Sequence, residues 1–523
     1  MKKSLNLLLS AAIALGFLAA VCLPAAAQSG ASYYVSVSEG DDSNPGTESS
    51  PWKSLAKLSA TTFAAGDTIH LKRGEVFEGT VTLHGTGSPS MPITLTTYGS
   101  GERPYIKGPG DPGRRSSCVT IAPDSQGWRL IGLEIGDGFN GIFIRIGNSA
   151  GNDYYYIEDC YIHNNVNAPA TLPFGHAITI KGTVPGVNTA SNITVKNCIF
   201  KDNDRDFFPD NLEFGIFLTG VLIDGCTFTG GGYNSIYHTC ATNFSITNNL
   251  WLHNGAGSIP VGNACIISGE LTGGPDTNMV AGNEFGYMRD PGGADGCAYD
   301  FEIDTDGISF VRNFVHNCVG QAVMIMPEAV CRDIRIEVNI FYKNLSGTER
   351  HKGELALYGG GTGTAANNIF QTRLRFSHFT KAIDGGAEGL GIYGNKIKNI
   401  ACLLLDTPEC TFDSAANTAK LSGPAGAALY YTTDGSVPTQ SGILYQGEEI
   451  PVGQTTAINC KAFAQDRLPS ITCSKVLTPC SGDYAAQTPV KSNFFDRISQ
   501  GLKDLADRIQ LCFFMGMRRK AIG

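Results

Sequence analysis

A short motif recurs along the middle of this chain at intervals typical of a stacked repeat protein. It consists of a branched strand residue, one or two spacers, an Asn or Cys, and two mostly apolar residues. Consecutive copies lie 23 to 38 residues apart. The marked positions are Cys160, Cys198, Cys226, Asn249, Asn283, Asn313, Asn339, Asn368 and Asn395. A period of this length indicates units that each pack against their neighbours.

The segments between the marked positions alternate apolar and polar residues, as in 176–182 (HAITIKG) and 299–307 (YDFEIDTDG). Helical repeats would show a period of 3.6, whereas a period of two indicates β-strands. Each unit is therefore expected to form one turn of a coil of short strands, paired with the turns above and below. An inward Asn can hydrogen-bond to its copy on the next turn, and Cys suits the same place as a small apolar residue.

Residues 1–27 combine a basic start, an apolar run and an A-x-A cleavage site, as a secretory signal peptide does. Cys22 raises a lipoprotein alternative, but Val21 is bulkier than the residue that usually precedes a lipidated Cys. We therefore expect a secreted or cell-surface protein. Residues 49–60 (SSPWKSLAKLSA) then predict a short helix, capped by Ser50, that covers the first turn of the coil.

The N-terminal part of the chain resembles a known superfamily. Residues 33–58, 64–81 (AAGDTIHLKRGEVFEGTV) and 92–108 (PITLTTYGSGERPYIKG) are similar to the opening of secreted bacterial right-handed parallel β-helix proteins. These are the pectate-lyase-like polysaccharide lyases and glycoside hydrolases. The resemblance implies an all-β chain in which residues 28–405 form a right-handed parallel β-helix, a solenoid with an N-terminal capping helix.

The repeat stops after Leu405, and residues 406–480 show four or five alternating strands separated by Gly, Pro and Asp turns. This pattern is typical of a small immunoglobulin-like β-sandwich. Residues 430–439 (YYTTDGSVPT) and 458–464 (INCKAFA) resemble the small domain appended to chitobiase, fucosidase and other secreted glycan enzymes. The resemblance implies an accessory role: spacing, docking or weak sugar contact.

Residues 481–523 change character again, from a polar linker to apolar residues at helical spacing. The periodicity predicts an amphipathic helix with a basic end over 493–520. Three roles stay open for this helix: docking on the protein's own surface, binding a partner, or touching a membrane surface.

Charge and cysteine content narrow the possible partners. The net charge is −9 and no basic stripe is present, so nucleic acid is not expected to bind. Sixteen Cys in an exported chain suggest disulfides, but those at the repeat positions are expected to be buried thiols. Cys460 with Cys473, and Cys402 with Cys410, are the more plausible bridges. The Cys spacing does not fit a zinc site.

An acidic strand at 298–307 (AYDFEIDTDG) is the best candidate for chemistry. If Phe301 and Ile303 point inward, the predicted catalytic residues point outward in one row. These residues are Asp300, Glu302 and Asp304. Like charges on one strand face require a cation, a shared proton or a substrate. A glycosidase would use two of them as acid and as nucleophile or base. A lyase would use them to hold Ca²⁺ beside a uronate.

Neighbouring turns supply candidate substrate-binding groups. They are Tyr237 and His238 on one adjacent turn, Glu270 at the end of another strand, Arg289 in the loop that enters the acidic turn, and Glu354 on the far side. A one-residue slip in register would reverse each of these faces.

A second acidic cluster lies in residues 201–215 (KDNDRDFFPDNLEFG), which we expect to form a loop between turns. Its candidate Ca²⁺ ligands are Asp204, Asp206, Asp210 and Glu213. Carboxylates in a turn suit a hard cation, although the spacing does not match an EF-hand. A hydrated surface loop is the alternative.

These observations predict a secreted carbohydrate-active enzyme that cleaves glycosidic bonds of a polysaccharide along the β-helix. Glycoside hydrolase is ahead of Ca²⁺-dependent lyase, because no Lys or Arg lies clearly in phase with the acidic strand, although Arg289 keeps the lyase open. A hydrolase would need no cofactor. The alternative from another class is a non-catalytic glycan-binding or adhesin-like solenoid. A glycan is the expected partner, and a monomer the expected state.

Overall fold

The computed structural model describes residues 30–480, apart from nine internal gaps. The gaps are 111–114, 148–151, 167–173, 256–264, 290–295, 327–328, 346–353, 358–359 and 372–389. The signal peptide predicted at 1–27 and the helical tail predicted at 481–523 lie outside the described residues. Within the described part, no helix is both long and apolar enough to cross a membrane.

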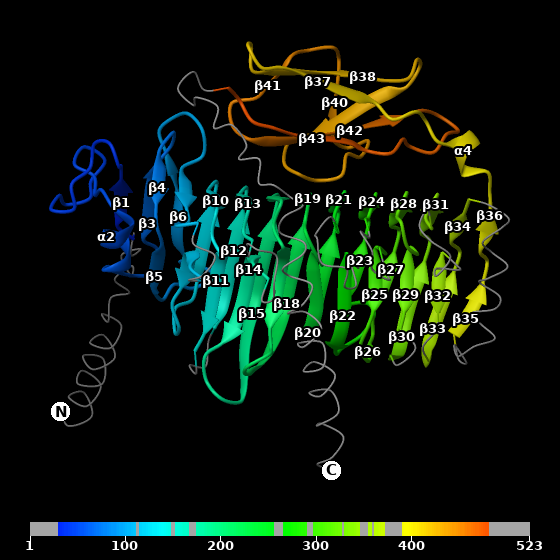
Figure 1. Cartoon of the computed structure of the whole chain (residues 1–523), viewed down its shortest axis with the longest axis horizontal. Coiled ribbons are helices and arrows are strands. Elements are labelled where there is room, and N and C mark those ends of the chain that lie inside the picture. Colours follow the sequence, from blue (N-terminus) through cyan, green and yellow to red (C-terminus); the bar gives the residue numbers. More distant parts are fainter. Residues whose placement is uncertain are drawn as a thin grey trace, which may run out of the picture. The chain divides into compact units, whose positions relative to one another are not determined.

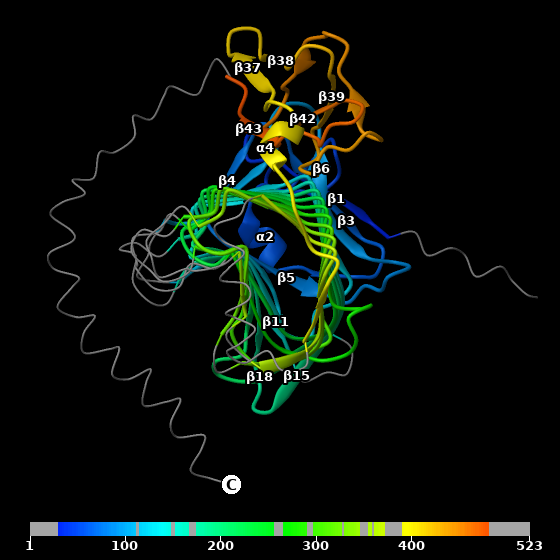
Figure 2. The same ribbon diagram turned by 90° about the vertical axis from the view of Figure 1, so that its right-hand side faces the viewer.

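Parallel strands pair turn by turn into sheets of 24 and 12 strands. The pairing of the larger sheet follows two separate series that meet at the long strand β20, so the coil has three faces (Figures 1 and 2). Successive turns stack side by side, as the alternation of the sequence predicts. The parallel β-helix is thereby confirmed.

The first face contains β2 (Thr62–Phe63), β5 (Val81–Gly85), β8 (Ser117–Ile121), β11 (Asn140–Ile146), β14 (His176–Gly182), β17 (Arg205–Asp210), β20 (Ile236–Thr247), β22 (Ile266–Leu271), β25 (Tyr299–Phe301), β29 (Val323–Ile325) and β32 (Leu355–Leu357). The second face contains β1 (Ser32–Val35), β3 (Thr68–Lys72), β6 (Ile93–Tyr98), β9 (Trp128–Ile131), β12 (Asp153–Glu158), β15 (Val187–Lys196), β18 (Gly215–Asp224), the later part of β20, β23 (Met279–Ala281), β26 (Thr305–Asp306), β27 (Ser309–Val311), β30 (Val330–Glu337), β33 (Gly360–Ala366) and β35 (Leu390–Tyr393). The third face contains β4 (Val76–Glu78), β7 (Tyr105–Lys107), β10 (Glu134–Gly136), β13 (Tyr161–His163), β16 (Ile199–Lys201), β19 (Thr227–Thr229), β21 (Leu250–Leu252), β24 (Glu284–Gly286), β28 (Phe314–His316), β31 (Ile340–Tyr342), β34 (Ile369–Phe370) and β36 (Lys396–Ile397).

The repeated Asn positions form one buried column along the coil. Each Asn side chain donates from Nδ2 to the Oδ1 of the next, over 3.0–3.2 Å, from Asn249 to Asn395. The same Oδ1 atoms also accept from the backbone amides of the preceding turn. The Cys part of the column continues directly, because the Cys226 amide donates to Asn249 Oδ1 at 2.8 Å. The predicted ladder is confirmed.

Aromatic rings fill part of the interior with one ring per turn. Phe200, Phe228, Trp251 and Phe285 stack at centroid distances of 4.6–4.7 Å. This spacing matches the separation of paired strands, about 4.8 Å. The register of the sheet therefore also sets the packing of the core.

A short helix covers the start of the coil. Helix α2 (Leu55–Ser59) buries Leu55 and Leu58, as the sequence pattern predicts. Its N-cap is Ser54, whose side chain accepts from the Lys57 amide, and not Ser50 as predicted. The residues before Ser54 are held in turns and bridges, since Trp52 hydrogen-bonds to the first strand of the coil.

A second helix and two antiparallel sheets follow the coil. After α4 (Ile400–Leu403), one sheet contains β37 (Glu409–Asp413), β38 (Thr418–Ser422) and β41 (Ile450–Pro451). The other contains β39 (Ala428–Thr432), β40 (Ile443–Leu444), β42 (Thr456–Phe463) and β43 (Cys473–Leu477). The two sheets enclose their own hydrophobic core, as a β-sandwich does.

The two proposed disulfides do not form in the structure. Cys402, Cys410, Cys460 and Cys473 are all free thiols. Cys402 is exposed whereas Cys410 lies in the core of the sandwich, so that pair is separated. Cys460 and Cys473 are opposite each other on β42 and β43 and pack there as small apolar side chains.

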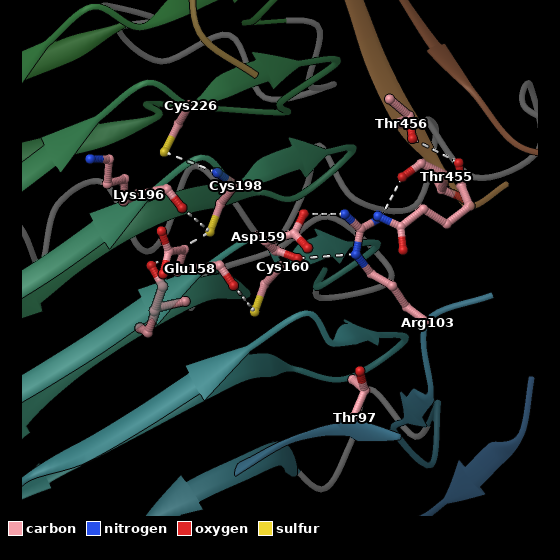
Figure 3. Close-up of polar contacts among 12 residues, drawn as sticks. Thr97, Arg103, Glu158, Asp159, Cys160, Lys196, Cys198, Cys226, Thr455 and Thr456 are labelled. Atoms are coloured by element: carbon pink, nitrogen blue, oxygen red, sulfur yellow. Dashed lines mark hydrogen bonds and ion pairs between the residues drawn. The ribbon is translucent and has the colours of Figure 1, made fainter. Parts of the chain in front are cut away.

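The sandwich is fixed to the third face of the coil by buried polar contacts. Lys461 Nζ donates to Glu284 Oε2 at 2.7 Å, and Thr472 donates to the same carboxylate from its amide and its hydroxyl. Nearer the N-terminus, Arg103 reaches both Asp159 of the coil and the carbonyl of Thr455 (Figure 3). The described residues from 30 to 479 accordingly form one compact unit.

Candidate functional site

The acidic strand predicted at 298–307 is interrupted in the structure. β25 ends at Phe301, and the amides of Glu302 and Ile303 both donate to the carbonyl of Ser268, over 3.2 and 3.3 Å. Two consecutive amides on one carbonyl mark a β-bulge, which breaks the alternation of faces. Ile303 is therefore 49% exposed, and the prediction that it points inward is wrong.

As a result, the three predicted catalytic carboxylates do not form one outward row. Asp300 is 1% exposed and lies between Ile267 and Met324 of the adjacent turns. Glu302 and Asp304 are exposed. The turn therefore offers one buried carboxyl group followed by two exposed ones.

Tyr237 lies on the outer side of β20, as predicted. The register places it beside Ile267, and so in the same column as Asp300, two turns away. Burial raises the pKa of the Tyr237 phenol; the positive charge of Arg205 opposes this shift and the negative charge of Glu302 adds to it. The phenol therefore keeps its proton, and its oxygen accepts a hydrogen bond from the Arg205 guanidinium at 3.1 Å.

His238 points into the coil instead, so its predicted place near the outer face is wrong. The side chain is fully buried, because the residue that follows an outward Tyr on a strand faces the interior. Its Nε2 donates to the carbonyl of Phe244 at 3.0 Å, and its Nδ1 accepts from the hydroxyl of Tyr299 at 2.9 Å. Burial lowers the pKa of His238 to about 3. A neutral structural role follows.

Arg205 lies against Tyr237 on the first face, surrounded by aromatic rings. Its guanidinium carbon lies 4.4–5.0 Å from four ring centroids, and these rings belong to Phe174, Phe208, Tyr233 and Tyr237. Nη2 donates to the Tyr237 hydroxyl at 3.1 Å. The side chain is 9% exposed, so it is a cation removed from most of its water.

A second bulge explains the position of Arg205. The amides of Asp206 and Phe207 both donate to the carbonyl of Ser235, over 2.8 and 2.9 Å. Both side chains are buried, which leaves Arg205 on the same outer side as Phe208. Simple alternation would place Arg205 inside with Phe207, so the sequence pattern does not mark Arg205 as an outward residue.

His176 is paired with Arg205 in the register of the first face. Asn140 donates to Ser117, so its Oδ1 accepts from His176 Nδ1 at 3.0 Å. His176 Nε2 is then an acceptor, buried and without a hydrogen-bond partner among the described residues. Burial, together with the Arg205 charge, holds the pKa of His176 well below its usual range. The imidazole is therefore neutral.

Glu270 is brought to the acidic turn, as predicted. Its backbone amide donates to the carbonyl of Asp304 at 2.9 Å. Its Oε2 accepts from the thiol of Cys240 at 3.1 Å and from the side-chain amide of Asn211 at 3.3 Å. Its place at the edge of the site is thus shown, while its contact with substrate stays a prediction.

Arg289 and Glu354 were also predicted to bind substrate. Arg289 is exposed. The pKa of His253 is lowered mainly by the burial of its own imidazole, and the positive charge of Arg289 adds to this effect. Glu354 is 8% exposed and accepts from the buried Nδ2 of Asn344 at 2.8 Å. Most of the Glu354 side chain therefore lies against the coil. Substrate contact by either residue stays a prediction.

The four acids of the predicted calcium loop do not converge. Asp206 and Asp210 lie in strand β17 and Asp204 directly precedes it, whereas Glu213 lies in the bend between β17 and β18. Asp206 is buried, whereas the carboxylates of Asp210 and Glu213 lie 3.4 and 2.9 Å from Lys181 Nζ. In the described part of the chain, no three His, Cys, Asp or Glu residues are placed to hold a metal ion. The calcium site therefore does not form at these residues.

Two family models match the chain. Residues 117–272 match a right-handed β-helix region, and residues 408–474 match the chitobiase/β-hexosaminidase C-terminal domain. The protein is a right-handed β-helix followed by a chitobiase-type domain. The predicted fold class is thereby confirmed, while the C-terminal helix lies outside the described residues.

Several known proteins are similar to parts of the chain. A lacto-N-biosidase from Bifidobacterium longum subsp. longum is 36% identical over 115 residues, which cover 18% of this chain and 7% of that protein. A solved structure of a GH136 lacto-N-biosidase from Eubacterium ramulus matches with a TM-score of 0.46 and 20% identity, over 70% of this chain and 67% of that one. An alginate lyase from Paenibacillus sp. matches with a TM-score of 0.37 and 12% identity, over 58% and 97%.

The part of the β-helix that carries the site covers five successive strands of the first face, β14, β17, β20, β22 and β25. The sequence located the acidic turn and Tyr237. It did not locate Arg205 and His176, which enter the site because a bulge shifts the alternation. The sequence around Arg205 shows only Phe207 and Phe208 close to it, because three of the four rings that surround it come from distant positions.

Proposed function

We propose that the chain is a secreted carbohydrate-active enzyme, a glycoside hydrolase that cleaves a glycan bound across the first face of the β-helix. The observation that carries the proposal is the acidic turn, where Asp300 lies in the same column as Tyr237 and is followed by the exposed Glu302. Most glycoside hydrolases use a pair of carboxyl groups, and aromatic side chains nearby can pack against the sugar rings.

The stacked turns support a substrate that is a chain of sugars. Outward side chains of one column repeat about every 4.8 Å along the first face. Phe208, Tyr237 and the apolar Ile267 line this column before Asp300. Aromatic and apolar side chains of this kind pack against sugar rings, while the phenol of Tyr237 can hydrogen-bond to a sugar hydroxyl.

The comparisons support hydrolysis as the reaction. The Bifidobacterium relative carries the name lacto-N-biosidase, and its identity of 36% is confined to 115 residues. The chain spans only 7% of the length of that relative, so its activity is a proposal for this chain. Glycans that contain a lacto-N-biosyl unit accordingly belong in the set of substrates to be tested.

Asp300 and Glu302 are the proposed catalytic pair. One would protonate the leaving oxygen, and the other would act as nucleophile or as base toward water. A carboxyl separation of about 5.5 Å would give retention, and one of about 6.5–9.5 Å inversion. The anomeric form of the first product, followed by NMR, distinguishes these outcomes.

The proposal is tested by assaying the purified chain against plant, host and microbial glycans, with release of reducing ends as the readout. Glu302→Gln and Asp300→Asn should each lower kcat by about 100-fold or more, because each removes a proton-transfer or nucleophilic group. Asp306→Asn is the matched control and should keep its activity. Asp306 lies in the same turn, but its side chain forms an exposed ion pair with Arg332 on the second face.

The outcomes separate the three classes of function. Loss of activity in both variants and normal activity in the control supports the hydrolase. Cleavage that produces an unsaturated product with ultraviolet absorbance would identify a lyase instead. Glycan binding that survives both substitutions, with no cleavage of any glycan, would identify a binding protein.

A further inference from the structure

Among the described residues, the buried guanidinium of Arg205 forms no ion pair. No carboxylate forms an ion pair with it among the described residues, although Lys181 on the neighbouring strand has two. Its Nε is buried without a hydrogen-bond partner, and its Nη1 forms no hydrogen bond within the described part of the chain. Of the five N–H groups of an Arg side chain, only one on Nη2 has an acceptor there, the Tyr237 hydroxyl.

The acids that lie near Arg205 in the sequence are committed elsewhere. Asp204 accepts from the Gly175 amide at 2.9 Å. Asp206 accepts from Ser235 at 2.6 Å and from Asn203 at 3.1 Å. The segment directly before Phe174, residues 167–173, contains no acidic residue in its sequence.

The surroundings of Arg205 hold it in place but do not neutralise it. Four aromatic rings attract the guanidinium, yet rings accept hydrogen bonds poorly and carry no net charge. His176 next to it is neutral, so it adds no second positive charge. A buried charge is costly unless it is paired, and a residue kept in this state is prepared for an anion that comes from outside the chain.

We propose that Arg205 binds an anionic group of the glycan, a carboxylate or a sulfate ester, so that the substrate is an acidic glycan. A guanidinium recognises either group through parallel N–H···O bonds. This inference rests on the proposed function, because that function is the reason for taking the ligand to be a glycan. The rings of Phe174 and Tyr233 keep the guanidinium in one orientation and exclude water from it.

The position of Arg205 fixes where the anion lies relative to the acidic turn. β17 and β25 are three turns apart along the first face, which is about 14 Å at the usual strand separation. The acidic sugar is therefore two or three sugar residues away from the bond that is cleaved. A short acidic oligosaccharide is long enough to contact both places.

The test measures binding of tetrasaccharides that carry one uronate or one sulfate ester, each compared with its neutral parent. Calorimetry is done on the full chain in the Glu302→Gln background, in which cleavage does not interfere. The acidic tetrasaccharides should bind about tenfold more tightly than the neutral parents. The uronate and sulfate arms show which anion is preferred.

Arg205→Met keeps the apolar stem and removes the charge, and it should abolish the preference for the acidic tetrasaccharides over their neutral parents. Arg332→Met is the matched control for the loss of one positive charge, because Arg332 is exposed on the second face. Thermal unfolding shows whether each variant is folded. If Arg205→Met does not fold, Arg205→Lys replaces it, and the preference should fall because the bidentate geometry is lost.

Equal affinity for acidic and neutral tetrasaccharides, or a preference that survives both Arg205 substitutions, would overturn the inference. Neutral glycans that are cleaved while no acidic preference exists would leave the hydrolase proposal intact. An acidic preference without cleavage of any glycan would support Arg205 and remove the hydrolase proposal.

Discussion

Asp206 illustrates how one position in a strand decides what a charged residue does. It follows Arg205 directly, but the bulge turns it into the coil, where it is 2% exposed. Burial raises the pKa of Asp206 to about 7, although hydrogen bonds from Ser235 and Asn203 act in the opposite direction. At neutral pH this carboxyl group is therefore close to half protonated, and its role is structural.

The raised pKa of Asp206 predicts how stability depends on pH. An Asp in the unfolded chain ionises near pH 4, so the folded state binds its proton more tightly. The free energy of unfolding should therefore fall by about 2–4 kcal/mol from this group as the pH rises from about 4 to about 7. Asp206→Asn should lack this contribution. Chemical denaturation of both proteins at pH 5 and pH 8 measures it, and parallel pH profiles would contradict it.

The Asn column shows how one residue in each turn stabilises the whole element. Asn313 Oδ1 accepts from both the backbone amide and the Nδ2 of Asn283, over 3.0 and 3.1 Å. Its own Nδ2 donates to the Val280 carbonyl and to Asn339. All of these groups are buried, so each needs its partner.

Asn313→Ala should lower the free energy of unfolding by about 2–4 kcal/mol, since it leaves two buried donors of Asn283 without an acceptor. Asn313→Cys should cost less, because a Cys sulfur occupies this column at Cys198 and Cys226, where the sulfur of one accepts from the amide of the other. Urea denaturation of the two variants compares them. Equal losses would contradict this expectation, because they would show that a Cys sulfur at this position does not replace the Asn oxygen as an acceptor.

At the scale of elements, the sequence was sufficient to predict the coil and its ladder. The repeat and the period of two depend on local composition, and both are visible without knowing the pairing. The bulges at Asp206 and at Glu302 are different, because each depends on which carbonyl of an adjacent turn accepts two amides. Residues distant in the sequence determine which carbonyl accepts the two amides. The sequence of the strand alone therefore does not show which of its acids face outward.

At the scale of the whole unit, the sandwich and the coil share one buried ionic contact. Burial opposes ionisation of Glu284, but the Lys461 charge and the His316 hydrogen bond outweigh it and hold the pKa of this carboxyl well below its usual range. Because the pKa is lower in the folded state, the ionised carboxylate stabilises the fold at neutral pH. This stabilisation is lost as the pH falls below the pKa of an ordinary Glu. Acid should therefore weaken the docking of the sandwich.

Lys461→Met should destabilise the docked unit by about 3–5 kcal/mol, because it leaves the Glu284 carboxylate buried without its cation. The double variant with Glu284→Leu should recover part of this loss. Lys420→Met is the control, since its pair with Glu449 is exposed and should contribute less than about 1 kcal/mol. Thermal unfolding ranks the three proteins, and equal effects of the two single substitutions would contradict the buried role of Lys461.

The candidate site was only partly predictable from the sequence. Tyr237 and Glu270 were located correctly because the position of each follows from the pairing of its strand with one neighbouring strand. His238 was misplaced although simple alternation after the outward Tyr237 turns it inward. Arg205 was missed because its assignment required knowing where alternation breaks. Asp300 lies in the predicted turn, but its burial between Ile267 and Met324 follows from pairing with other turns.

The most direct test of the proposed site is a crystal structure of the Glu302→Gln protein soaked with an oligosaccharide that the wild-type enzyme cleaves. We expect the sugars to lie along the first face, against Tyr237, with the bond to be cleaved beside Asp300 and Gln at position 302. An oligosaccharide bound only to the sandwich, or to another face of the coil, would contradict the account.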